Sequence, residues 1–196
     1  MVLDDGRFEE SENIKDINDL SLKEIDDIES CLRSLEQLID TQKYSDCIRY
    51  LKWMKEKLDI NRLAHEQDEK KKMDQKHMHP IRPRRGEIYL AQLGENIGKE
   101  INDKHLVLIV QNNKGNLYSN TVVCIPISSN SKLYYSHEKI ELKDIKNGRL
   151  DKLPSKAKTE QIHYLDKARL IHKVAELESE AVERICVRLM KNLDIK

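Results

Sequence analysis

The chain has 196 residues, with 35 Asp or Glu against 35 Lys or Arg, so its formal net charge at neutral pH is zero. This balance gives no whole-chain argument for binding nucleic acid or a membrane, and no apolar run approaches the roughly 20 residues of a transmembrane helix. With an acidic N-terminus unlike a signal peptide, the sequence predicts a cytoplasmic protein. The charge is uneven, however: residues 1–30 are acidic, and the stretch 70–85 is mostly basic.

The cysteines and histidines give no metal or disulfide pattern. Four cysteines are scattered along the chain without a C-x-x-C pair, at Cys31, Cys47, Cys124 and Cys186. This spacing favours small buried thiols in a reducing compartment over disulfides or zinc ligands. His77 and His79 form an isolated H-x-H, which is weak evidence for metal binding. We therefore expect no metal site and no cofactor.

The N-terminal part predicts two helices. Ser21 and Glu24 form an S-x-x-E capping box, which marks a helix start. An apolar stripe follows at alternating spacings of three and four, at Ile25, Ile28, Leu32, Leu35 and Ile39. After a polar break at 40–42, a second stripe runs through Tyr44, Ile48, Leu51, Met54 and Leu58. Two stripes of similar length joined by a short turn predict an antiparallel helical hairpin, preceded by a frayed acidic segment of about 18 residues.

The pattern changes after Pro80 and Pro83. Short segments rich in Ile, Val, Leu and Tyr predict strands at 87–93, 105–111 and 121–127, with weaker strands at 138–142 and 156–162. An amphipathic helix follows from about Ser179. The fold class is therefore α+β: an N-terminal extension at 1–80, then a small SH3-like antiparallel barrel with a C-terminal helix at 81–196.

Several blocks in this second part resemble, in chain order, the MazF/PemK family of toxin endoribonucleases. They are Arg-Gly-Glu-Ile-Tyr-Leu at 85–90, Val-Leu-Ile-Val-Gln-Asn at 107–112, Pro-Ile-Ser-Ser at 126–129, and Glu-Gln-Ile at 160–162 followed by Asp166-Lys167 and Arg169-Leu170. The resemblance covers about 110 residues, from about Arg84 to the end of the chain. It implies an SH3-like barrel, a homodimer, metal-free cleavage of single-stranded RNA at short sequences, and a cognate antitoxin peptide.

Two departures from the family pattern fall at the implied catalytic positions. The family has Arg-Pro-Val-Leu at the head of its second strand, where this chain has His105-Leu106-Val107-Leu108. The family's catalytic Thr at the end of its third strand corresponds to Ser128, which keeps a hydroxyl. Replacing Arg by His is not conservative, because a permanent bidentate cation gives way to a group that titrates near neutral pH.

Metal-free RNA cleavage lets the substrate's 2′-hydroxyl attack the adjacent phosphate, giving cyclic phosphate and 5′-hydroxyl ends. It needs a base, an acid and donors to the phosphate. We assign His105 as acid or base, Ser128 as the phosphate donor, and Lys99 or Lys158 as the cation lost with the Arg. Glu100 and Glu160 lie where the family is often acidic, so each is a candidate base or partner of His105. The alternative for these isolated charges is solvated surface.

Further residues are candidates for holding RNA. Gln161 is expected to contact a base edge, and His163 takes a position that is often Arg in the family. The segment between the third and fourth strands carries Lys132, Tyr134 and Tyr135, so it is our candidate for sequence readout by base stacking.

Three functional classes stay open at this level. The first is an active endoribonuclease toxin, and the second is a catalytically dead relative that keeps the barrel as a binding module, which the His105 and Leu106 departures support. The third is a poison of DNA gyrase, as in the related CcdB toxins. The N-terminal hairpin either packs on itself, extends a dimer interface, or lets the acidic residues 1–30 fold over the RNA groove as an internal inhibitor.

Overall fold

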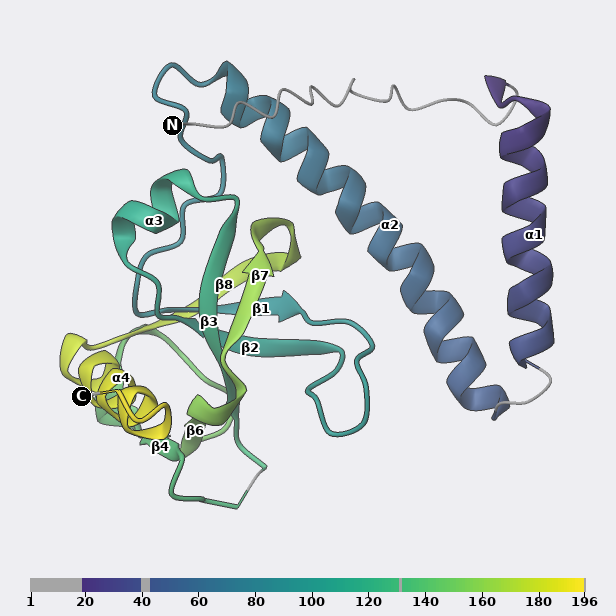
Figure 1. The fold of residues 1–196 in the computed structure, drawn as a ribbon. Coiled ribbons are helices and arrows are strands. Elements are labelled where there is room, and N and C mark those ends of the chain that lie inside the picture. Colours follow the sequence, from purple (N-terminus) through teal and green to yellow (C-terminus); the bar gives the residue numbers. More distant parts are fainter. Residues whose placement is uncertain (1–18, 40–42, 131, 196) are drawn as a thin grey trace. The chain divides into compact units, whose positions relative to one another are not determined.

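The computed structural model of the protein describes residues 19–39, 43–130 and 132–195 (Figure 1). The chain divides into two compact units between Arg49 and Tyr50, and each unit is described by itself. The acidic segment 1–18 and the polar break at 40–42 lie outside the described residues. In the part of the chain that is described, no helix combines the length and apolarity that crossing a bilayer demands.

The two N-terminal helices form where the sequence predicts them. Helix α1 (Leu22–Ile39) begins with the expected capping box: the backbone N–H of Ser21 donates to Glu24 Oε2 at 2.8 Å, and the Glu24 N–H donates to Ser21 Oγ at 3.3 Å. Helix α2 (Tyr44–Met73) starts in the first unit and continues through the second. The packing of α1 and α2 as an antiparallel hairpin stays a prediction.

Beyond Tyr50, α2 is attached to the strands by specific contacts. The Trp53 ring lies against Gly94, where an added Cβ would come within 2.2 Å of the ring, and Gly94 has a φ of +89° that suits only glycine. Gln92 Nε2 donates to Glu56 Oε1 at 2.7 Å. The predicted domain boundary at residue 80 stays a prediction, but these contacts join residues on both sides of it.

Eight strands in the described residues form one curled antiparallel sheet. They are β1 (Glu87–Gln92), β2 (Lys104–Ile109), β3 (Thr121–Ser128), β4 (His137–Ile140), β5 (Ile145–Gly148), β6 (Ser155–Lys158), β7 (His163–Asp166) and β8 (Leu170–Leu177). The strand order is β4-β6-β3-β2-β1-β8-β5, and β7 pairs with the start of β3. Because β4 and β5 lie at opposite ends of this order and are joined through residues 141–144, the sheet curls towards closure.

The central strands are buried on both faces. Leu108 of β2 faces one apolar cluster, which helix α4 (Ser179–Asn192) completes with Ala181, Val182 and Ile185. Its neighbours Val107 and Ile109 face a second cluster that contains Val122 and Leu165. Successive strand residues point to opposite faces, so burial on both sides requires an unbroken apolar run, as at 106–110.

The predicted fold class is confirmed, with N-terminal helices, a curled antiparallel sheet and a C-terminal helix, but the sequence-based strand count was too low. β5, β7 and β8 were not predicted, nor was the short helix α3 (Asn113–Tyr118). The predicted strand at 156–162 is instead β6 followed by a 3-10 turn, η3 (Thr159–Gln161). Register shifts between β1 and β8 disrupt the alternation of side chains that predicts a strand.

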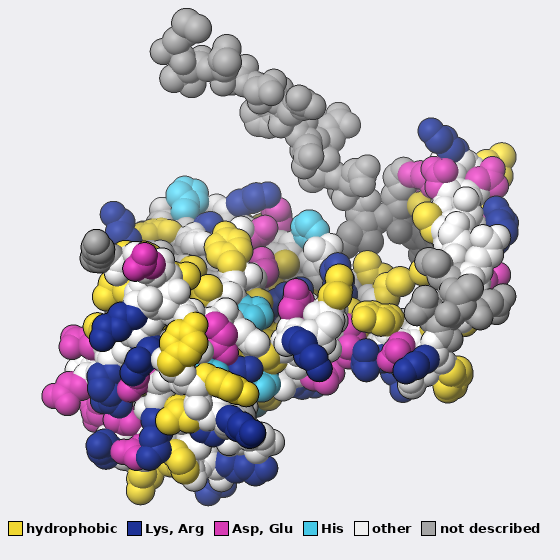
Figure 2. Space-filling view, turned by 60° about the horizontal axis from the view of Figure 1, so that its bottom comes forward, with side chains coloured by type: hydrophobic (Ala, Val, Ile, Leu, Met, Phe, Trp, Pro, Cys, Tyr) yellow, Lys and Arg dark blue, Asp and Glu magenta, His cyan; other side chains and the backbone are white. Residues whose placement is uncertain are grey.

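On one face of the molecule, positive and negative side chains are interspersed (Figure 2). Over the face shown in Figure 2, Lys and Arg side chains interleave with Asp and Glu, and hydrophobic side chains lie between them. On that face the zero net charge of the chain therefore reflects local mixing of the two signs.

Candidate active site

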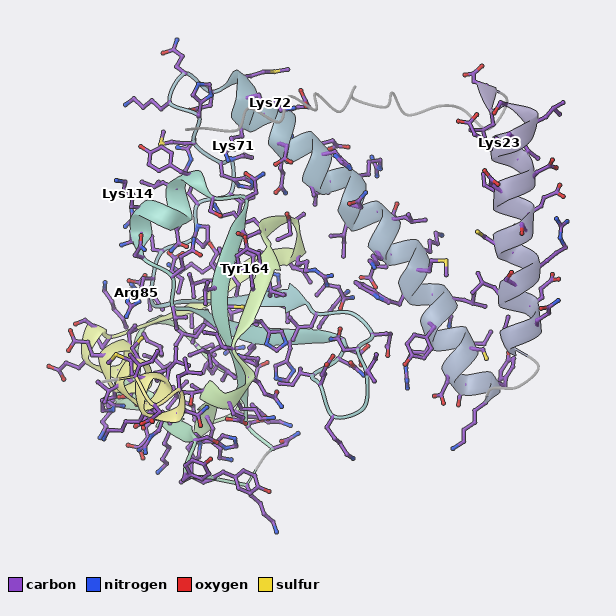
Figure 3. The ribbon with its side chains drawn as sticks, in the orientation of Figure 1. Lys23, Lys71, Lys72, Arg85, Lys114 and Tyr164 are labelled. Carbon is purple, nitrogen blue, oxygen red and sulfur yellow. The ribbon has the colours of Figure 1, made fainter. Side chains whose placement is uncertain are left out.

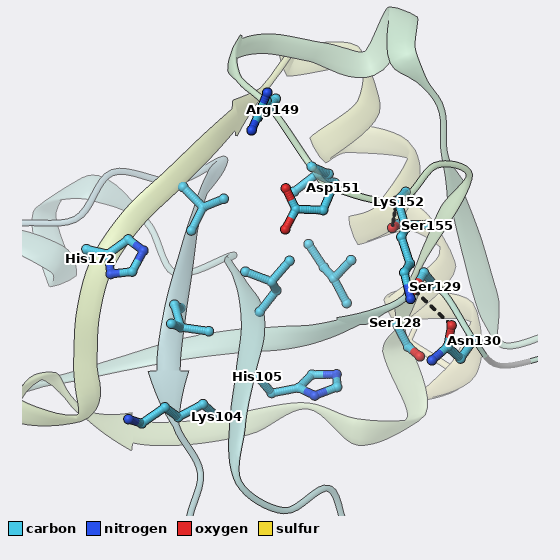
Figure 4. Close-up of a pocket in the computed structure, with 15 residues that line it drawn as sticks. Lys104, His105, Ser128, Ser129, Asn130, Arg149, Asp151, Lys152, Ser155 and His172 are labelled. Atoms are coloured by element: carbon cyan, nitrogen blue, oxygen red, sulfur yellow. Dashed lines mark hydrogen bonds between the residues drawn. The ribbon is translucent and has the colours of Figure 1, made fainter.

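The start of β2 and the end of β3 bring together the two residues that we assigned to catalysis. Leu106 is the register partner of Ile127, so the antiparallel ladder places the residues beyond this pair, His105 and Ser128, next to each other. Both line an open cleft of about 600 Å³ at this end of the barrel (Figure 4). The cleft thus contains a ring nitrogen and a hydroxyl held by two central strands.

The rest of the cleft comes from residues that the sequence analysis did not single out. The segment between β5 and β6 contributes Arg149, Asp151 and Lys152, β2 contributes Lys104, and β8 contributes His172. Figure 4 shows the Lys152 side chain extending towards the end of β3, where Ser128 and Ser129 lie. The local signal was a charged run, Arg-Leu-Asp-Lys, before a proline, and nothing in its spacing connects it to β2 or β3.

Three cations line the cleft that contains His105 and Ser128. Lys104, Arg149 and Lys152 line it together with one carboxylate, that of Asp151. The Ser155 hydroxyl donates to the backbone carbonyl of Lys152 at 2.7 Å and so fixes the turn that carries these residues. An excess of positive charge around a hydroxyl and an imidazole suits a phosphate-bearing ligand.

The environment of His105 favours its neutral form. Burial lowers the pKa of its imidazole below the ordinary 6.5, and the positive charges of Lys158 and His163 lower it further, against the opposing effect of its bond to the Ile127 backbone. Ring atom Nε2 is buried and has no hydrogen-bond partner among the described residues. A neutral imidazole with an unused nitrogen is ready to accept or donate a proton.

A second hollow lies next to the first. The loop between β1 and β2, the turn η3 and the start of β7 line it with five predicted polar residues, Lys99, Glu100, Glu160, Gln161 and His163. Lys158 Nζ lies 3.4 Å from Gln161 Oε1. His163, which lines this hollow, and Lys158 both lower the pKa of His105 through their charges, so the second hollow lies near that histidine.

Glu160, however, is bound to a histidine that the sequence analysis missed. His137 is buried, with its Nε2 2.9 Å from Glu160 Oε1 and its Nδ1 3.0 Å from the backbone carbonyl of Lys132. The Tyr134 backbone N–H also lies 3.4 Å from Nδ1, so each ring nitrogen has a partner inside the protein. The Thr159 hydroxyl adds a third link, donating to the Ser136 carbonyl at 2.6 Å. We call this group, His137, Glu160, Thr159 and Ser136, the loop clamp.

The hydrogen bonds of the loop clamp affect the pKa of Glu160 and the position of the segment between β3 and β4. Burial alone would raise the pKa of the Glu160 carboxyl, but hydrogen bonds from its own backbone N–H, from His137 and from Ser136 outweigh this and lower the pKa. The clamp holds the segment between β3 and β4, where Tyr134 is 58% exposed and Tyr135 84% exposed, against η3. Two solvent-exposed tyrosine rings on a fixed backbone are available for stacking on nucleic-acid bases.

The fold and the cleft together define a small barrel domain with a polar, cation-lined cleft at the ends of its central strands. A family model of PemK-like, MazF-like toxins of type II toxin–antitoxin systems matches residues 84–193, more than half of the chain. The chain belongs to this family.

Solved structures similar to the chain are MazF-type proteins of low sequence identity. An endoribonuclease from Mycobacterial species is 20% identical, with 58% of this chain and 93% of that chain covered and a TM-score of 0.47. An endoribonuclease in complex with its cognate antitoxin, also from Mycobacterial species, is 21% identical, with 59% and 96% covered and a TM-score of 0.46. MazF from Deinococcus radiodurans is 16% identical, with 58% and 97% covered and a TM-score of 0.49.

Proposed function

We propose that this toxin is an endoribonuclease that cleaves single-stranded RNA at short sequences without a metal ion. Membership of the PemK/MazF toxin family supports the reaction class. The observation that carries the proposal is the pair of His105 and Ser128 in an open cleft, with His105 Nε2 buried and unpartnered among the described residues.

The reaction that fits this pair is an internal transfer of the phosphate. His105 takes the proton of the 2′-hydroxyl, whose oxygen attacks the adjacent phosphorus, and the bond from phosphorus to the 5′-oxygen breaks. Ser128 donates a hydrogen bond to a non-bridging oxygen, and the cations of the cleft stabilise the charge that builds up there. The departing oxygen takes a proton from solvent or from an ammonium group of the cleft. The products carry a cyclic phosphate and a 5′-hydroxyl.

Sequence preference would come from the second hollow and from the segment between β3 and β4 that carries Tyr134 and Tyr135, which we call the tyrosine loop. Gln161 presents an amide that can pair with a base edge, and Lys99 and His163 lie beside it for the flanking phosphates. Tyr134 and Tyr135, with Lys132, present stacking faces and a cation on the clamped loop. Glu100 lies at the exposed rim of this hollow, where it would repel RNA placed out of register.

Two partners follow from the family. A type II toxin is neutralised by an antitoxin protein, so we infer that an acidic antitoxin segment covers the cationic cleft and blocks RNA. We also infer a homodimer, in which two clefts would act on separate RNA segments.

The test is cleavage of a long single-stranded RNA by the purified full-length protein with EDTA present. Three variants run alongside: His105→Ala, Ser128→Ala, and His65→Ala as a control for an exposed histidine on α2. Cleavage that survives EDTA and the control, and is lost in both site variants, supports the proposal. Activity that requires an added divalent ion contradicts metal independence, and activity retained in His105→Ala contradicts the assigned base.

A catalytically dead relative remains the second candidate because His105 stands where the family has its Arg. Under this reading the cleft binds RNA but does not cut it. Full-length protein that binds single-stranded RNA in competition with antitoxin, yet leaves it intact over hours, would establish this alternative.

A further inference from the structure

The basic stretch noted in the sequence forms a surface at the other end of the barrel from the cleft. It consists of the end of α2, the segment 74–85 and helix α3, and we call it the basic neck. Its cationic side chains are Lys70, Lys71, Lys72, Lys76, Arg82, Arg84, Arg85 and Lys114. Most of it precedes residue 84, where the family match begins, so the neck belongs mainly to the N-terminal extension.

Hydrogen bonds hold the parts of the neck together. The His79 N–H donates to the Leu117 carbonyl at 2.8 Å, and the Arg85 N–H donates to Asn113 Oδ1 at 2.8 Å. The segment 79–85 therefore lies along α3. Lys71 Nζ donates to Asn120 Oδ1 at 2.6 Å, which joins the end of α2 to the start of β3. Figure 3 shows Lys71 and Lys72 at this end of α2, with Lys114 on α3. The end of α2, the segment 79–85 and α3 are therefore joined to one another, whereas the Arg85 guanidinium turns to the Val110 carbonyl and Cys186 Sγ.

Only part of the positive charge is neutralised. Lys72 pairs with Glu69 at 2.7 Å, and Arg82 makes a longer contact of 3.6 Å with Asp74. Four further side chains are exposed and make no ion pair or side-chain hydrogen bond within the described ranges, namely Lys70, Lys76, Arg84 and Lys114. On the face shown in Figure 2, by contrast, acidic and basic side chains are mixed.

Burial lowers the pKa of two groups beneath the neck, and nearby positive charges add to its effect. Burial lowers the pKa of Lys167 to about 8, and the neighbouring charges of Lys71 and Arg82 also lower it, against a raising effect of Asp166. Burial likewise lowers the pKa of His79, and the charges of Lys167 and Lys71 add to the effect. Like charges held this close destabilise the fold, and a bound polyanion would relieve that cost.

We propose that the basic neck binds the phosphate backbone of RNA that flanks the segment in the cleft. This inference rests on the proposed ribonuclease function. A chain with zero net charge must hold RNA through local cationic surfaces, and unpaired lysines are point charges suited to phosphates of any sequence. Tyr118 on α3, 43% exposed, adds a ring on which a base can stack.

The position of the neck fixes the length of RNA that can use it. Asn120, which binds Lys71, directly precedes Thr121, the first residue of β3, whereas Ser128 is the last. Seven steps of about 3.3 Å each put the two ends of β3 roughly 23 Å apart. A short oligonucleotide filling the cleft cannot reach the neck, but a longer strand can engage both.

The test compares two full-length variants with the same loss of charge. The neck variant combines Lys70→Gln, Lys76→Gln, Arg84→Gln and Lys114→Gln, and the control combines Lys43→Gln, Lys52→Gln, Lys55→Gln and Lys57→Gln, all exposed lysines on or just before α2. The probes are 2′-O-methyl RNA strands of about 30 and about 3 nucleotides, which lack the attacking hydroxyl; at roughly 3.4 Å per stacked nucleotide only the long strand spans the distance from cleft to neck. Their binding is followed by fluorescence anisotropy over a range of salt concentrations.

For the neck variant we expect about 10- to 100-fold weaker binding of the long strand, and a salt slope smaller by about 2 to 3, from the loss of four phosphate contacts. Binding of the short strand should stay within about 2-fold, and the control should match the wild type. Equal losses in both variants, or no loss in the neck variant, would overturn the proposal. So would a neck that binds an acidic peptide of residues 1–30 but not the long strand. Because the probes cannot be cut, neck binding without nuclease activity on ordinary RNA would reject only the ribonuclease proposal.

Discussion

Two histidines near the end of β3, one partly buried and one fully buried, behave in opposite ways. His105, near the start of β2, lines the open cleft and leaves Nε2 without a partner among the described residues. His137, at the start of β4, is closed off from solvent and bound at both nitrogens by Glu160 and the Lys132 carbonyl. The two rings have the same chemistry and similar positions at strand starts, yet only one has capacity left for a ligand.

Under the proposed function, this difference separates a catalytic histidine from a structural one. A buried polar atom without a partner costs about 1–3 kcal/mol, so a fold retains one mainly where something else uses it. His105, beside Ser128, leaves Nε2 without a partner among the described residues, whereas both nitrogens of His137 form hydrogen bonds that hold the tyrosine loop. Position along a strand does not separate these roles, and hydrogen-bond partners do.

The largest effect should come from His105→Ala. Losing the base should lower kcat by about 10² to 10⁴. The free energy of unfolding should fall by only about 0.5–1.5 kcal/mol, from the lost bond between the ring and the Ile127 backbone. The pH profile sharpens the test. A neutral base with a pKa below 6.5 loses activity as the pH falls through that pKa, so kcat/KM should show an acid limb below pH 6.5. His105→Arg should lack this limb, and an unchanged limb there would show that another group titrates.

His137→Ala should act on binding and stability instead. The change leaves Glu160 and the Lys132 carbonyl without their partner, and should cost about 1–3 kcal/mol in the free energy of unfolding. The freed tyrosine loop should raise KM several-fold and broaden the set of sequences that are cut, with kcat nearly retained. Cut-site mapping on a long RNA and steady-state kinetics measure both. A fall in kcat like that of His105→Ala, at constant KM, would contradict the division between the two histidines.

Glu160→Gln isolates the charge within the loop clamp. The carboxyl's pKa is lowered in the folded state, so its contribution to stability is present above the ordinary pKa of 4.5 and is lost as the pH falls through the folded value. The Gln variant keeps an acceptor for His137 but has nothing to titrate. Its urea midpoint should therefore fall less than that of the wild type between neutral pH and pH 3. Parallel curves would show that the carboxylate's bonds to His137 and Ser136 add no stability.

The parts of the fold that were predictable are those that local sequence determines. The capping box at Ser21 and Glu24 sets a helix start by itself, and the unbroken apolar run of β2 follows from burial on both faces. β8 was missed because its first half exposes polar side chains, as at His172 and Lys173, and its pairing with β1 contains register shifts. An exposed, irregular strand lacks the alternation that identifies one.

The candidate site divides in the same way. The family resemblance pointed to His105 and Ser128, and the β2–β3 ladder makes them neighbours. Lys152 and the other residues of the β5–β6 segment reach the cleft only because the sheet curls, which no local pattern encodes. His137 was not predicted as a site residue because its partner Glu160 lies 23 residues further along the chain, and no local pattern connects the two.

The smallest effect should come from Ser128→Thr, which restores the family's residue. Ser128 is the last residue of β3 and borders open space in the cleft, so an added methyl group does not have to displace packed atoms. The hydroxyl that donates to the phosphate remains, and a β-branched residue suits a strand end. We expect kcat/KM within about 3-fold of the wild type, against a loss of about 10- to 100-fold in Ser128→Ala, where the donor is gone. If Thr impairs cleavage as much as Ala does, the side chain acts by fitting a small space and not by donating a hydrogen bond. The space around position 128 would then accept Ser but not the family's Thr, and so differ from that of the family.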